Sequence, residues 1–153
     1  MRKTLFLSLL VTSTLFFSCT VENIEPEVPI PTVPETTSAT FTWQEDNGST
    51  ITTDSAFWTT GNWGTGISAF KGNHFFEINW DAPNDISIGT KVLTIPYGFT
   101  YLKPPRTYTC SSNDSLTISA NTSNKLSGNT TVNVIGGSIT TVSISYANIP
   151  FKL

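Results

Sequence analysis

The chain has 153 residues and a formal net charge of −3, and only 12% of its residues are charged, against about 25% in an ordinary soluble domain. The basic residues form no stripe and are not interleaved with aromatic residues, which excludes the clustered cations that a nucleic-acid partner requires. The length favours one folded domain.

The first nineteen residues predict export and lipidation. A basic start precedes an apolar run at 5–17, which is too short for a membrane-spanning helix and is typical of a secretory signal. Ser18 and Cys19 follow, and this ending resembles the lipobox of bacterial lipoproteins. The resemblance implies that residues 1–18 are a cleaved signal peptide, that Cys19 carries a diacylglycerol, and that its amino group receives a fatty acid such as palmitate.

Residues 19–38 predict a disordered tether. After Cys19 the sequence "TVENIEPEVPIPTVPETTS" holds four prolines, four glutamates and no aromatic residue, so it lacks the apolar surface that folding requires. Proline makes such a segment an extended spacer. With Cys19 bound to lipid, Cys110 has no disulfide partner, and we expect it to be a small buried residue at a strand end.

From residue 39 onward, apolar and polar residues alternate with the period of two that strands require. The alternation predicts strands at 39–43, 66–70, 74–80, 91–95, 115–119, 125–134 and 140–147. Turn residues separate these runs, Asp46-Asn47-Gly48 among them. We therefore expect 39–153 to form an all-β domain, an antiparallel β-sandwich of seven to eight strands with immunoglobulin-like or related topology.

Several short motifs resemble those of the small lipoproteins common in Bacteroidota, which join a lipobox and an acidic or proline-rich spacer to one all-β domain. The motifs are "FTWQEDNG", "IGTKVL", "LTIS", "LSGNTTV" and the final "VSISYANIPF". The resemblance implies a location and a fold but no activity. Glu22 and Glu25 resemble export signals to the outer membrane, so we expect a cell-envelope protein held at that membrane through the lipid on Cys19.

Catalytic templates find little support in the residue inventory. The chain has one histidine, His74, and lacks a serine nucleophile elbow and a glycine-rich phosphate loop, so we expect no enzyme and no cofactor. A carboxylate pair drawn from Glu77, Asp81 and Asp85 stays open as an alternative, because two positioned carboxylates hydrolyse glycosides. The run "DAPND" at 81–85 offers oxygen ligands to calcium, but an Asx-type turn explains it better, and we expect no metal site.

Aromatic residues give the strongest binding signal. Two segments, "AFWTTGNWGTG" and "PYGFTYLKPP", are rich in glycine or proline and are therefore predicted to be loops. Their candidate ligand-binding residues are Trp58, Trp63, Tyr97 and Tyr101, and Trp63 and Tyr97 are the pair we expect to be exposed. The alternative is that these rings fill the core.

The preferred prediction is a membrane-anchored lipoprotein whose β-sandwich serves as a structural or binding domain without catalysis, with an envelope protein as one possible partner. The alternative is a glycan-binding accessory lipoprotein that stacks its loop aromatics on sugar rings. Asp54-Ser55-Ala56 resembles the O-glycosylation sites of exported Bacteroidota proteins, so Ser55 is a candidate modification site.

Overall fold

Eleven strands make up the part of the chain that the computed structural model describes, which is residues 38–62 and 64–153. The strands are β1 (Thr40–Glu45), β2 (Ile51–Thr52), β3 (Ser55–Gly61), β4 (Gly64–Lys71), β5 (His74–Trp80), β6 (Gly89–Leu93), β7 (Phe99–Lys103), β8 (Arg106–Cys110), β9 (Asp114–Thr122), β10 (Lys125–Ile135) and β11 (Thr141–Pro150). All the strand pairs are antiparallel, so the all-β antiparallel prediction is confirmed, with eleven strands rather than seven to eight. The predicted signal peptide, Cys19 and nearly all of the tether lie outside the described residues.

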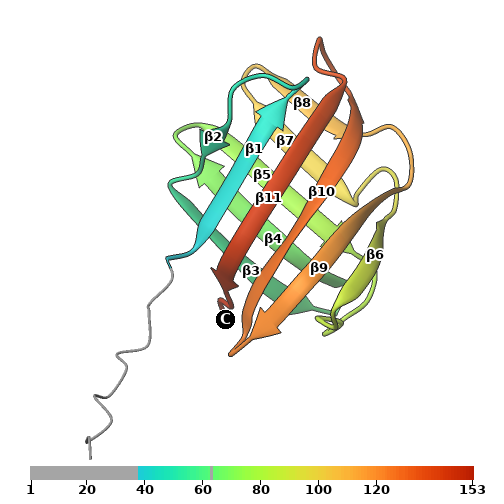
Figure 1. Ribbon diagram of the computed structural model, residues 1–153. Helices are drawn as coiled ribbons and strands as arrows, with labels where there is room; N and C mark the ends of the chain where they lie inside the picture. The colour runs from blue at the N-terminus through green and yellow to red at the C-terminus, as the bar shows by residue number, and fades with distance from the viewer. Residues whose placement is uncertain (1–37, 63) are drawn as a thin grey trace, which may run out of the picture. The chain divides into compact units, whose positions relative to one another are not determined.

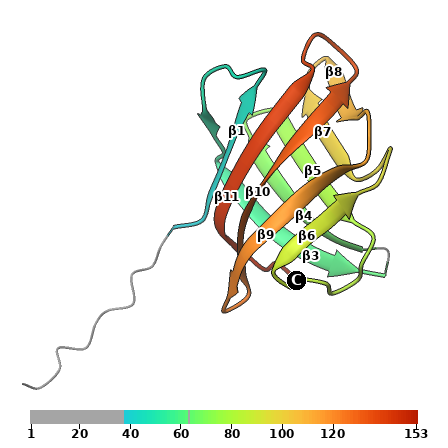
Figure 2. The ribbon, with the colours of Figure 1, turned by 45° about the vertical axis from the view of Figure 1, so that its right-hand side comes forward.

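The strands form two layers that belong to one curled sheet (Figures 1 and 2). The front layer has the order β2-β1-β11-β10-β9-β6, and the back layer has the order β8-β7-β5-β4-β3. The long strand β10 joins them, because its residues 125–130 pair with β9 whereas Val134 and Ile135 pair with β8. On the opposite side, Phe151 forms a bridge with Trp58 of β3, and Lys152 donates its backbone N–H to the Trp58 carbonyl at 2.9 Å.

The core lies between the layers and is built from every second residue of each strand. On β5, the exposed fractions of Phe76, Ile78 and Trp80 are 0–2%, as the period of two predicts. The Phe76 ring stacks on Tyr101 with centroids 4.1 Å apart and meets the edge of Trp43 at 4.8 Å. These contacts join β1 of the front layer to β5 and β7 of the back layer.

Two segments that were expected to be loops are strands. "AFWTTG" forms most of β3, and "FTYLK" forms β7, so the loop prediction is wrong for both. Most of the glycines and prolines that prompted it lie at or beyond strand ends: Gly61 ends β3, Gly64 begins β4, and Pro104 and Pro105 connect β7 to β8. Consequently Trp58, Phe99 and Tyr101 alternate into the core.

A glycine permits a close crossing in the front layer. Gly128 lies at an irregularity in the pairing of β10 with β9 and β11. The Tyr146 side chain passes over it and donates its hydroxyl to the carbonyl oxygen of Thr117 at 3.0 Å. Any side chain at 128 would occupy the space of both groups, so the position requires glycine.

Candidate ligand-binding site

A hollow of about 440 Å³ lies on the outer side of the back layer. We call it the Tyr97 hollow, and its lining residues are Gly61, Gly64, Glu77, Asn79, Asp81 and Tyr97. Glu77 and Asn79 face outward because they alternate with the buried Ile78 and Trp80 along β5. The volume falls in the range of ~300–1,000 Å³ that is usual for small-molecule sites.

Glycines leave this part of the sheet without side chains. Gly61 and Gly64 face each other in the β3–β4 hairpin, and Gly66 lies opposite Asn79 in the β4–β5 register. A Cβ at Gly66 would collide with Oδ1 of Asn79, so the amide lies directly over that glycine. The run "GNWGTG" is therefore the sequence signal for the hollow, although sequence reasoning took it as a loop.

Tyr97 stands at the rim of the hollow on the connection between β6 and β7. Its side chain is 82% exposed. The connection is fixed from both sides, because Gly98 donates its N–H to Thr94 and accepts a hydrogen bond from the backbone N–H of Asn79 at 2.9 Å. The prediction that Tyr97 is exposed is confirmed, whereas its role in binding stays a prediction.

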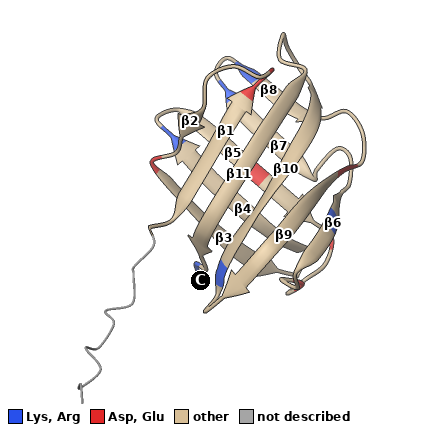
Figure 3. Ribbon diagram, viewed as in Figure 1, with Lys and Arg blue, Asp and Glu red and all other residues tan. Residues whose placement is uncertain are grey.

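The two carboxylates of the hollow differ from every other acid in residues 38–62 and 64–153. Glu77 and Asp81 accept no hydrogen bond and form no ion pair with the described residues. The other five acids are satisfied: Glu45 by Tyr101 and Lys103, Asp46 by Thr140 and Thr141, Asp54 by Lys71 and Gly72, Asp85 by Ser87 and Lys91, and Asp114 by Asn133. No basic residue lines the hollow, and Figure 3 shows how few charged residues the fold carries, with none along β11.

Asp85 does not line the Tyr97 hollow, although it shares a smaller cavity of about 260 Å³ with Asp81. Its two carboxylate oxygens each lie 2.7 Å from Nζ of Lys91, whose side chain is only 8% exposed. Hydrogen bonds from Lys91 and then from Ser87 lower the pKa of Asp85 to about 2. Glu77 and Asp81, in contrast, do share one hollow. In the described part of the chain, no group of three or more potential metal-ligating side chains comes together.

Two of the predicted ligand-binding aromatics are core residues, so that prediction is wrong for them. Trp58 is 4% exposed, donates its indole N–H to the Asn124 carbonyl at 2.9 Å and packs against Phe151. Tyr101 is 0% exposed. Neither ring can stack on a ligand at the surface. Trp63, the residue before Gly64, lies outside the described residues.

Tyr101 instead belongs to a polar cluster that joins the layers. Its hydroxyl donates to Oε1 of Glu45 at 2.6 Å and lies 2.9 Å from Nδ1 of His74, while Nζ of Lys103 lies 2.6 Å from the other Glu45 oxygen. Burial acts to raise the pKa of Glu45, but the hydrogen bonds from Lys103 and Tyr101 outweigh it and lower the pKa overall. Burial, followed by the Glu45 contact, raises the pKa of Tyr101. The cluster therefore fixes the front strand β1 to β5 and β7.

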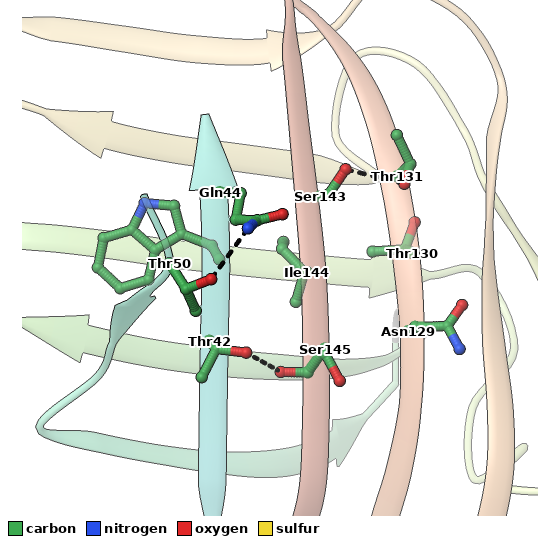
Figure 4. A pocket seen from close by; sticks show the side chains of 10 residues that line it. Thr42, Gln44, Thr50, Asn129, Thr130, Thr131, Ser143, Ile144 and Ser145 are labelled. Carbon is green, nitrogen blue, oxygen red and sulfur yellow. Dashed lines mark hydrogen bonds between the residues drawn. The ribbon is translucent and has the colours of Figure 1, made fainter. Parts of the chain in front are cut away.

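A second, shallower groove of about 260 Å³ lies on the outer face of β1, β11 and β10 (Figure 4). Hydroxyl and amide side chains dominate its outward lining: Thr42, Gln44, Thr50, Asn129, Thr131, Ser143 and Ser145. Many of these groups satisfy one another, because Gln44 donates to Thr50 at 2.9 Å and the hydroxyls of Thr131 and Ser143 lie 3.1 Å apart. The Tyr97 hollow is the stronger site, since its polar side chains have no such partners among the described residues.

The remaining predicted sites lie apart from both cavities. Ser55 is exposed at the start of β3, and its glycosylation stays a prediction. Cys110 ends β8 and is 2% exposed, which confirms the expected buried residue at a strand end, and burial raises the pKa of its thiol.

No family model, curated protein or solved structure matches the chain. Within residues 38–62 and 64–153, no helix has the length and apolar character needed to cross a membrane.

Proposed function

We propose that the chain is a cell-envelope lipoprotein, anchored through Cys19, whose β domain binds a saccharide in the Tyr97 hollow. The observation that supports this function is the exposed ring of Tyr97 beside three polar side chains, Glu77, Asn79 and Asp81, that have no partner among the described residues. Aromatic rings provide a flat apolar surface for the C–H face of a sugar, and carboxylates and amides accept and donate hydrogen bonds to its hydroxyl groups.

Pull-down on insoluble chitin, chitosan, xylan and cellulose tests the binding function with the full-length protein. We expect retention on at least one of these glycans and a loss of about tenfold in affinity for Tyr97→Ala, the loss that removal of one stacked ring causes. Ile135→Ala is the matched control, because Ile135 is also a large exposed apolar residue, at 57%, and does not line the hollow. Equal binding by Tyr97→Ala and the wild-type protein would refute the site.

Fractionation of cells tests the anchor separately. We expect Cys19→Ala to fold normally and to leave the membrane fraction, because the thiol that receives the lipid is gone. Retention of this variant in membranes would contradict the anchoring proposal without affecting the binding proposal.

A second candidate function, glycoside hydrolysis, is favoured by the presence of Glu77 and Asp81 in one hollow. Product analysis after prolonged incubation with the bound glycan distinguishes the two functions. A binding domain releases the glycan intact, whereas a hydrolase releases shorter sugars and loses this activity in Glu77→Gln.

A further inference from the structure

The charge of the Tyr97 hollow restricts the saccharide that it accepts. We infer that the ligand is an amine-bearing sugar whose ammonium group is attracted by the carboxylates of Glu77 and Asp81, and this inference rests on the proposed function. The cavity of about 440 Å³ and the exposed Tyr97 ring define the site, and the two carboxylates define the selection.

Glu77 and Asp81 have no hydrogen-bond partner among the described residues. Five of the seven acidic side chains in the described part of the chain accept hydrogen bonds, and the two that do not are the two that line this hollow. The pairing of the other five indicates that the fold readily satisfies its acids. Two acids that share one cavity and have no partner among the described residues are therefore the place where we expect the ligand to supply one.

The ligand group that meets these two carboxylates is expected to carry positive charge. The basic residues of the described part are engaged or placed elsewhere: Lys71 contacts Asp54, Lys91 contacts Asp85, Lys103 contacts Glu45, Arg106 contacts the Gly136 carbonyl, Lys152 lies over Phe57, and Lys125 begins β10. A bound ligand would displace water from Glu77 and Asp81, and burying carboxylates is unfavourable unless the ligand supplies donors or positive charge. An acidic sugar would add like charge and is excluded.

Tyr97 and Asn79 indicate that the positive charge belongs to a sugar. Tyr97 gives the hollow a flat apolar surface, which suits a sugar ring and also attracts an ammonium group that lies over its face. The Asn79 amide, held over Gly66, adds a donor and an acceptor for neighbouring hydroxyl groups. An amino sugar can contact the Tyr97 ring, the Asn79 amide and the carboxylates at once, whereas a bare cation leaves Tyr97 and Asn79 without a contact.

Calorimetric titration of the full-length protein with three oligosaccharides of equal length tests the inference. The probes are a glucosamine oligomer, its N-acetylated form and an oligogalacturonate, each at about 0.05 M and about 0.5 M salt. We expect the glucosamine oligomer to bind about tenfold more tightly than the acetylated form at low salt, the difference to shrink at high salt, and the galacturonate not to bind.

Variants separate this inference from the proposed function. Glu77→Gln and Asp81→Asn should each remove most of the preference for the amine while retaining binding of the acetylated oligomer, and Asp54→Asn, an acid outside the hollow, should change neither. Equal affinity for the amine and its acetylated form would overturn the inference and leave saccharide binding intact. Failure of all three oligosaccharides to bind would overturn the inference, and the proposed function would fall with it only if none of the four insoluble glycans retains the protein. A lysine-rich peptide that binds as tightly as the glucosamine oligomer would overturn the assignment to a sugar.

Discussion

Replacement of Gly128 by alanine should be among the most destabilising single-methyl changes in this domain. The new Cβ would lie 2.5 Å from Oη of Tyr146 and well inside van der Waals contact with the Thr117 carbonyl oxygen. Overpacking of a tight core position costs about 1–3 kcal/mol, and a buried carbonyl that loses its hydrogen bond costs about 1–3 kcal/mol more. We therefore expect Gly128→Ala to lower the free energy of unfolding by roughly 3–5 kcal/mol, a large part of the ~5–15 kcal/mol of a typical domain.

Urea denaturation and thermal melting of the purified protein measure this effect. The melting temperature should fall by roughly 10–20 °C, since ~1 kcal/mol corresponds to several degrees in a domain of this size. Gly61→Ala is the matched control, because a Cβ there meets no atom within 4 Å, and it should change the stability by less than about 0.5 kcal/mol.

The double variant Gly128→Ala/Tyr146→Phe tests the cause. Removal of the Tyr146 hydroxyl relieves one of the two collisions, but the Thr117 backbone oxygen stays in place, so only part of the stability should return. Gly128→Ala within about 1 kcal/mol of the wild-type protein would refute the reasoning, since that result requires the crossing of Tyr146 over β10 to be loose.

Three further predictions concern the contacts that join the elements. Glu45→Gln should lower the stability by about 1–2 kcal/mol at pH 7, because it weakens the bonds to Tyr101 and Lys103. The pKa of Glu45 is lowered in the folded state, so this stabilisation is present above the unfolded value of 4.5 and is lost as the pH falls through the folded value. In urea titrations, the difference in unfolding free energy between the variant and the wild-type protein should therefore shrink on acidification. A difference that stays constant would contradict the assignment. Asp85→Asn should lower the melting temperature more than Lys91→Met, because the first change leaves a buried ammonium without its carboxylate and the second removes the ammonium; the reverse order would refute the role of this pair. Trp58→Phe should cost about 1–3 kcal/mol through the lost bond to Asn124 and the space left beside Phe151, and a thermal melt unchanged from wild type would show that neither contact matters.

Periodicity predicted the seven strands β1, β4, β5, β6, β9, β10 and β11, but it missed β7 and β8, although their residues also alternate into the core. On β5, the buried Phe76 and Ile78 alternate with outward Glu77, and on β10 and β11 threonine, serine and asparagine fill the outward positions. The same reasoning missed β3, because Phe57 faces outward next to the inward Trp58 and so breaks the alternation. Phe57 is tolerated there because it stacks on Phe70 of β4 at 5.9 Å and lies beneath the Lys152 ammonium at 4.4 Å, and Lys152 is 95 residues away in the sequence.

The site was predictable only in part. Tyr97 and Glu77 could be identified as candidates from residue type and local context, but the contribution of Asn79 depends on Gly66, which lies opposite it on β4. The difference between Asp85, which is ion-paired, and Asp81 depends on Lys91, which reaches Asp85 from β6. Such tertiary ion pairs determine which acid of the 81–85 loop has a partner among the described residues. The four-residue spacing of Asp81 and Asp85 does not reveal which acid this is.

The pairing of β1 with β11 determines when this domain can close during synthesis. β1 begins at Thr40, and its one long partner ends at Pro150, so the first strand waits until about a hundred more residues have been made. Phe151 and Lys152 then complete the contacts with Trp58 on β3. Contacts of such large sequence separation form slowly, since a long loop must close before they are gained. A growing chain therefore stays open until β11 has emerged, and a product that ends before Thr141 would leave both β1 and β10 with unpaired edges for a protease to attack.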